Sequence, residues 1–310
     1  MDISKIKTCS IKKRKSKVNI REFAKTSRKN ASFRKFYRIL PDILAARSFK
    51  SIVSWIIQAR KNKKPVIFML GAHTIKCGLN PIIIDLMKKG YITTVCLNGA
   101  GIIHDFELSL IGKTSEDVAA ALDKGLFGMA EETAVFINEA IKKGAESGAG
   151  LGEAVGRMIL NKRLPQRGLS ILASAYKLKI PLTVHVALGT DIIHQHPSCN
   201  GAAIGKTSMA DFYKLVEIVS GLTGGVLVNA GSAVILPEVF LKALNIARNL
   251  GRKVANFTTV NFDMIYHYRP AENIVSRPVA CGGRGYYIIG HHEINIPLLY
   301  QALLEEGDIS

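Results

Sequence analysis

The chain has 310 residues, 48% of them hydrophobic, and a formal net charge of +18. This is enough for a large core, in one α/β domain or in two smaller ones. No run of eighteen apolar residues suggests a membrane span, and the polar, basic first thirty residues do not resemble a secretory signal. Five scattered cysteines without CxxC spacing indicate reduced thiols, so we expect a cytoplasmic protein without a structural zinc site.

The positive charge is concentrated at the amino terminus. Residues 1–40 hold 14 Lys and Arg against 2 Asp and Glu, whereas the other 270 residues hold 28 against 22. We therefore predict a basic arm over residues 1–40 and a single α/β domain over residues 41–310. Such an arm can contact nucleic acid or anionic lipid. Because no nucleic-acid motif accompanies it, we favour an extension that packs on a neighbouring subunit or stays mobile.

From residue 65 onward, strand-like and helix-like segments alternate. Apolar or β-branched runs predict strands at residues 65–71, 91–98, 182–188, 225–230, 253–260 and 286–290. Helical spacing predicts helices at residues 79–89, 167–179, 208–221 and 236–249. Strands joined by crossover helices imply a Rossmann-like, mainly parallel sheet with helices on both faces. The stretch at 102–165 is too long for a simple crossover, and its pattern predicts a helical insertion.

Polar residues and glycines gather where the predicted strands end, and ligands bind at that edge in open parallel sheets. Seven of the eight histidines fall in these loops, and only His185 falls inside a strand. Glycine turns let backbone N–H groups approach phosphates, so we expect a dinucleotide or a similar ligand. The strand-end candidates are Gly71, His73, Thr74, Asn98, Gly99, Ala100, Gly101, His104, Asp105, Asp191, Gly231, Ser232, Asp263, Glu272, His291, His292 and Glu293.

The histidines leave two interpretations open. His194 and His196, with His104 and Asp105, could supply metal ligands, as in a metal-dependent hydrolase or lyase. We favour substrate-binding or acid–base roles, for which histidine is suited at neutral pH, and predict no bound metal. Cys77 lies four residues after His73, and we expect a structural thiol there rather than a nucleophile.

The order of these motifs over residues 65–305 resembles the deoxyhypusine synthase family. MLGAHTIKCGL resembles that family's first cofactor turn, CLNGAGIIHDFEL its second glycine turn, and VALGTD the strand end that supplies an aspartate, here Asp191. VNAGSAVILPEVF resembles its glycine-rich turn and helix, and FTTVNFD a strand end carrying Thr258, Thr259 and Asp263. YRPAENIVS resembles its arginine-proline-acidic segment, which here contains Glu272.

The resemblance implies an NAD-binding subunit of a homotetramer with a transferase activity on a polyamine. In the family, NAD oxidises spermidine, and a lysine carries the aminobutyl group as an imine before its transfer to translation initiation factor 5A. Here SRPVACGGRG stands where that lysine should follow, and Lys253 is the last lysine of the chain. Arginine cannot form an imine in its place, because a guanidinium stays protonated.

Two further departures concern charged positions. His104 stands where the family has an acidic residue, and Glu238 where it has a histidine. We therefore expect an enzyme that binds NAD and oxidises or transfers part of a small amine without the imine step. The expected catalytic residues are His104, Asp105, Glu238, Glu272, His291, His292 and Glu293. A non-enzymatic ligand-binding or nucleic-acid-binding protein remains a further alternative.

Overall fold

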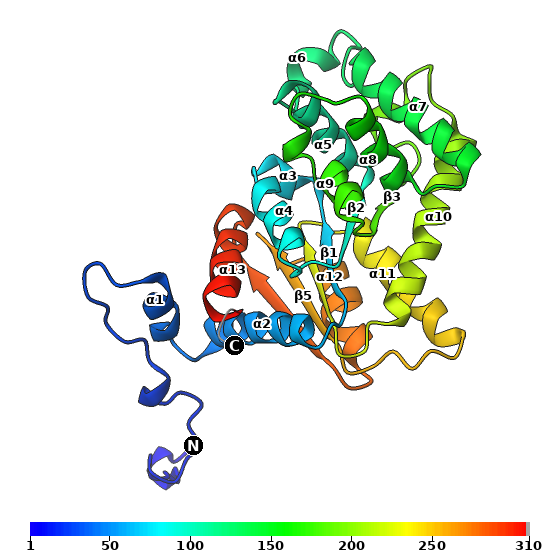
Figure 1. The fold of residues 1–310 in the computed structure, drawn as a ribbon. Helices are drawn as coiled ribbons and strands as arrows, with labels where there is room; N and C mark the ends of the chain where they lie inside the picture. The colour runs from blue at the N-terminus through cyan, green and yellow to red at the C-terminus, as the bar shows by residue number, and fades with distance from the viewer. Residues whose placement is uncertain (308–310) are drawn as a thin grey trace.

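The computed structural model describes residues 1–307, and its strands form one six-stranded sheet (Figure 1). Neighbouring strands are all parallel, in the order β3-β2-β1-β4-β5-β6. The strands are β1 (Val66–Leu70), β2 (Thr94–Asn98), β3 (Leu182–His185), β4 (Val226–Ala230), β5 (Thr258–Asp263) and β6 (Arg284–Ile289). This is the order of a Rossmann fold, so the predicted fold class is confirmed.

The central strand β1 shows why the sheet forms the middle layer. All five of its residues are buried, as expected for a parallel strand covered on both faces. Its side chains alternate between the two faces: Phe68 and Leu70 join one core cluster, and Ile67 and Met69 join the other.

Helices cover both faces of the sheet. On one face lie α2 (Leu44–Lys61), α4 (Asn80–Lys88) and α13 (His292–Gly307). On the other lie α10 (Gly201–Ser220) and α11 (Ile235–Asn249). The sequence prediction omitted α2 and α13. In α2, Phe49, Ile52, Val53 and Ile56 are buried at the spacing of a helix with one apolar face, so the signal was present.

The chain between β2 and β3 is helical. It contains α5 (Gly99–Ile111), α6 (Val118–Leu122), α7 (Glu131–Ser147), α8 (Leu151–Asn161), η3 (Arg167–Leu169) and α9 (Ile171–Leu178). Figure 1 shows these helices together at one end of the molecule, with α8 and α9 beside β2 and β3. The other short elements are α3 (Ala72–Lys76), η4 (Ile192–His194), α12 (Tyr268–Pro270), the π-helix η5 (Ala271–Ser276) and η6 (Arg277–Val279).

The amino-terminal segment extends away from the sheet (Figure 1). It contains the 3-10 turns η1 (Ile3–Lys5) and η2 (Ile20–Glu22), and nearly all of residues 1–32 are exposed. The helix α1 (Phe33–Ile39) packs on α13, where Arg38 pairs with Glu306 at 3.1 Å. The last part of the predicted arm is therefore in contact with the domain.

Among the helices, α10 begins at Gly201, seven residues before its predicted start, and among the strands the largest boundary error concerns β5. The predicted strand 253–260 covers only the first part of the true strand, which begins at Thr258 and ends at Asp263. Asn256 adopts the left-handed conformation, with φ of 54°, and this breaks an extended run just before β5. Within residues 1–307, no helix is both long and apolar enough to cross a membrane.

Candidate functional site

The carboxyl ends of the strands lie along one edge of the sheet, and the winding of the chain reverses between β1 and β4. In open parallel sheets, ligands bind beside such a reversal. β1 leads into Gly71 and helix α3, and β4 leads into Gly231 and Ser232.

The two loops at the reversal touch each other directly. The Gly71 N–H donates to the carbonyl oxygen of Ala230 at 2.8 Å. A Cβ atom added to Gly71 would lie 2.0 Å from the carbonyl oxygen of Gly231, and Gly231 itself has φ of 72°. Glycine is therefore required at both positions. The backbones of the loops that follow β1 and β4 are in direct contact there.

His292 lies behind this contact, in the first turn of α13. Its side chain is 1% exposed, and neither ring nitrogen has a hydrogen-bond partner among the described residues. Its ring lies 6.0 Å from that of His73, and its Nε2 would be 2.8 Å from a Cβ atom on Gly231. Burial lowers the pKa of His292, and the nearby Asp263 carboxylate partly offsets this. A buried neutral imidazole with two unused nitrogens can serve as an acceptor and as a donor.

Asp263 ends β5 at the same edge. One carboxylate oxygen accepts from the Met264 N–H at 2.8 Å and lies 3.8 Å from Nε2 of His267. The side chain is 7% exposed. The structure thus brings Gly71, Gly231, Asp263 and His292 close together at this edge of the sheet.

A cavity of about 250 Å³, lined by none of these four residues, opens over the carboxyl ends of β2 and β3. Helix α5 forms one wall, and the loops at 115–118 and 190–192 form others. Its polar lining includes Lys76, His104, Glu107, Glu116 and Asp191.

Asp191 is the most unusual group of this cavity. Its side chain is 7% exposed, and Oδ2 has no hydrogen-bond partner among residues 1–307. Burial raises the pKa of Asp191 to about 6. Oδ2 faces the first residue of α5, since a Cβ atom on Gly99 would lie 1.8 Å from it. Nε2 of His194, also buried, lies 3.8 Å from Oδ2, beyond hydrogen-bond distance, and a buried carboxylate oxygen without a hydrogen bond costs stability.

His104 is held in one orientation by a chain of hydrogen bonds. Its Nδ1 lies 2.6 Å from Oγ1 of Thr114, and that hydroxyl donates to Glu107 at 2.5 Å. Because the hydroxyl proton is directed to Glu107, the hydroxyl oxygen must accept from Nδ1–H of His104. This leaves Nε2 as the acceptor, and burial lowers the pKa of His104. Such an imidazole can take a proton from a ligand in the cavity.

Asp105 does not share this environment, although it follows His104 in sequence. Its carboxylate is fully buried and accepts from Nδ2 of Asn80, Oγ of Ser170 and the backbone N–H groups of Ile171 and Leu172. The residue anchors the first turn of α9. These four bonds use its acceptors, so the position does not fit the catalytic role suggested from sequence.

Thr258 and Thr259 also lie away from the candidate site. They begin β5, and five residues separate Thr258 from Asp263, which corresponds to about 16 Å of strand. Both are therefore near the amino edge of the sheet. The cofactor role suggested for them rested on the strand ending near residue 260, which is wrong.

Glu238 and Glu272 are paired with basic side chains beside α11. Glu238 contacts Lys242, accepts from Asn273 at 2.8 Å and lies 3.4 Å from Arg269. Glu272 lies 3.4 Å from Arg277. These contacts join α11 to the arginine-proline-acidic segment, but neither carboxylate lines the cavity.

Several other predicted residues have local structural bonds. Oδ1 of Asn98 accepts from Gly101 N–H and caps α5, next to Ala100. The Thr74 hydroxyl donates to the Gly71 carbonyl, and Ser232 Oγ accepts from Leu236 N–H. His291 and Glu293 are exposed at the start of α13.

The histidine pattern was partly misread. His73, His104 and His292 lie in the helices α3, α5 and α13 rather than in loops, whereas His185 is buried in β3 as predicted. His196 is bonded to Ser198 at 2.8 Å. Over residues 1–307, no group of three or more His, Cys, Asp or Glu side chains is arranged to hold a metal ion.

Sequence reasoning missed Glu107, Lys76 and Thr114. Glu107 lies three residues after His104, so both occupy the same face of a helix, and this spacing could have identified the pair. Lys76 and Thr114 come from α3 and from the loop after α5, and no local pattern connects them to the cavity.

No protein-family model and no curated protein matches the chain in sequence. Solved structures do resemble its fold. An arginine dihydrolase of cyanobacteria, ArgZ, superposes with a TM-score of 0.54 at 12% identity, covering 85% of this chain and 32% of ArgZ. A Methanococcus maripaludis protein assigned as LOR/SDH gives a TM-score of 0.52 at 16% identity, covering 91% of this chain and 72% of that protein.

An Entamoeba histolytica protein assigned as a deoxyhypusine synthase gives a TM-score of 0.50 at 12% identity. The match covers 90% of this chain and 95% of that protein. AgrE, which has been solved with ornithine and NAD⁺, gives a TM-score of 0.51 at 12% identity, covering 84% of this chain and 33% of AgrE. At these identities the comparisons establish a shared fold.

Proposed function

We propose that this protein binds NAD at the carboxyl edge of its sheet and oxidises, or transfers part of, a small amine. The observation that carries the proposal is the cavity in which Asp191 has an unused carboxylate oxygen and His104 an unused Nε2. Support comes from the Rossmann strand order and from the similarity of the fold to AgrE, which has been solved with NAD⁺ and ornithine.

The residues present fit a dinucleotide in chemistry. The Asp191 carboxylate, which lines the cavity, would accept from ribose hydroxyls, and the start of α5, where Ala100 lines the same cavity, would favour a phosphate. A cavity of about 250 Å³ lies below the usual range for ligand pockets, so it suits one half of a dinucleotide. The other half would lie outside this cavity, along the carboxyl edge of the sheet. Bound NAD would accept the hydride of the amine carbon.

The protein's own groups would handle charge and protons. Glu107 and Glu116 give the cavity a negative wall that suits an ammonium group, opposed by one lysine, Lys76. His104, oriented through Thr114, would take the proton from the amine nitrogen as the carbon is oxidised. An imine with the chain is not part of this proposal. No lysine follows Lys253, so the position of the family's lysine is empty of one, and Arg277 and Arg284 are engaged with Asn273 and with the ring of Trp55.

We further propose a homo-oligomer, by the resemblance a tetramer, with the basic arm contacting a neighbouring subunit. Ile11, Ile20 and Phe23 of the arm are exposed, and apolar side chains of this kind are commonly buried at subunit contacts.

Reduction of NAD in the presence of amines tests the activity. Spermidine, ornithine and arginine should be offered to the full chain, and NADH fluorescence followed. We expect NADH to form with at least one amine and expect His104→Ala to reduce its rate by about a hundredfold, the usual contribution of a general base. Lys206→Ala, on the exposed side of α10, is the control. NADH formation that is unchanged in His104→Ala would contradict the role of His104.

A further inference from the structure

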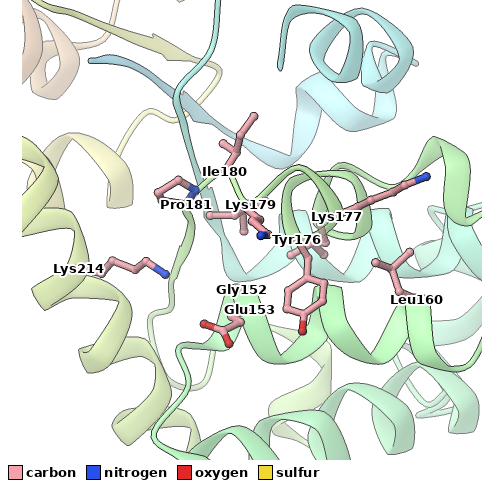
Figure 2. Close-up of a pocket in the computed structure, with 11 residues that line it drawn as sticks. Gly152, Glu153, Leu160, Tyr176, Lys177, Lys179, Ile180, Pro181 and Lys214 are labelled. Atoms are coloured by element: carbon pink, nitrogen blue, oxygen red, sulfur yellow. The ribbon is translucent and has the colours of Figure 1, made fainter. Parts of the chain in front are cut away.

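A larger cavity lies at the other edge of the sheet, beside the amino end of β3. Its volume is about 470 Å³, and helices α8, α9 and α10 surround it (Figure 2). Volumes of this size are typical of sites for small molecules. The cavity shares no lining residue with the one at the carboxyl edge.

Charged and polar groups from different helices converge in this cavity. Figure 2 shows the ends of Glu153, Tyr176, Lys179 and Lys214 reaching into one common space, whereas Lys177 points away from it. No salt bridge joins Glu153, Lys179 or Lys214 to another side chain within residues 1–307. Two ammonium groups and a carboxylate are thus available to a ligand.

Local helix electrostatics explains only part of this arrangement. Lys179 caps the carboxyl end of α9, where the helix dipole favours a cation. However, it does so in the left-handed conformation, with φ of 57°, which is unfavourable for a residue with a side chain. Lys214 comes from α10, and its charge also stabilises the buried Asp211 carboxylate behind the cavity wall. Neither effect requires Glu153 to share the space with both lysines.

Apolar side chains form the rest of the wall. Leu160, Leu172, Ile180 and Pro181 line the cavity beside the Tyr176 ring. We propose that this cavity binds a zwitterionic amino acid with a large apolar side chain. Its carboxylate lies between Lys179 and Lys214, its ammonium group meets Glu153, and its side chain packs on the apolar wall.

Calorimetric titration of the full chain with phenylalanine tests this site. Phenylalaninamide, which has no carboxylate, and 3-phenylpropanoate, which has no ammonium group, are the matched probes. We expect phenylalanine to bind at least about tenfold more tightly than either, the usual effect of losing one charge-assisted hydrogen bond. Lys179→Ala with Lys214→Ala should remove this preference over the amide, and Glu153→Gln should remove the preference over 3-phenylpropanoate.

Two control variants separate this cavity from other sites. Lys206→Ala removes a lysine from the same helix as Lys214 but outside the cavity, and should bind phenylalanine as the parent does. Asp191→Asn, at the opposite edge, should also leave the affinity unchanged. Absence of phenylalanine binding, or equal binding by the Lys179 and Lys214 double variant, would overturn the proposal. Loss of binding in Asp191→Asn alone would assign phenylalanine to the carboxyl edge and would overturn it as well.

Discussion

Replacing Asp191 by asparagine should make the protein more stable and less able to bind its ligand. Burial raises the pKa of this carboxyl from 3.8 to about 6. Because the folded state then binds the proton more tightly than the unfolded state, the contribution of Asp191 to stability is complete below about pH 3.8. It is lost as the pH rises through 6. A shift of about two pH units corresponds to about 3 kcal/mol at neutral pH.

Asparagine has the same shape and carries no charge to desolvate. Asp191→Asn should therefore raise the free energy of unfolding by up to about 3 kcal/mol at pH 8, with little gain near pH 4. The melting temperature should rise by several degrees at pH 8. Thermal unfolding across this pH range, followed by circular dichroism, measures the effect.

Asp105→Asn is the matched control. Burial also raises the pKa of Asp105 to about 6, but all four of its acceptor bonds are made. The NH₂ group of asparagine would face N–H or O–H groups that now donate to the carboxylate, so this variant should be less stable than the parent at pH 8. The reasoning is refuted if Asp191→Asn is destabilised at pH 8, or if both variants change in the same direction.

Three further outcomes are expected. The protein should form no deoxyhypusine on initiation factor 5A with spermidine and NAD, since residues 270–285 contain no lysine; an aminobutyl adduct trapped on this chain by borohydride would disprove this. Deleting residues 1–32 should leave the melting temperature nearly unchanged but dissociate the oligomer, which the mass in solution measures. A collapse of the melting temperature with the oligomer intact would argue against it. His292→Ala should lower the melting temperature by several degrees because the ring is buried, whereas His104→Ala should leave it nearly unchanged while weakening ligand binding; equal melting temperatures would contradict the contrast.

The sheet could be predicted because its strands are short apolar runs separated by turn residues. Strand ends were harder to predict, so Thr258 and Thr259 were assigned to the wrong end of β5. The strand begins late because Asn256 is in the left-handed conformation, which the local sequence does not indicate. Topology then located the reversal between β1 and β4, together with Gly71, Gly231 and Asp263.

Side-chain roles were harder to predict because they depend on contacts between distant segments. Asp105 resembles a catalytic carboxylate in sequence, but its partners come from α4 and from the start of α9, up to 67 positions away. Likewise, Asp191 is unusual because its buried Oδ2 packs on Gly99 and lies 3.8 Å from Nε2 of His194 without a hydrogen bond. The hydrogen bonding of the two buried carboxylates distinguishes a structural aspartate from a candidate ligand-binding one, and the local sequence pattern does not.

Calorimetric titration of NAD into the full chain, compared with Asp191→Asn, tests the central claim most directly. We predict saturable binding to the parent and an affinity lower by about tenfold or more in the variant. The NH₂ group that replaces one carboxylate oxygen cannot accept a hydrogen bond from the ligand. Glu272→Gln, which changes a carboxylate outside the cavity, should bind NAD as the parent does. Absence of NAD binding by the parent, or equal binding by Asp191→Asn, would contradict the assignment of this cavity to NAD.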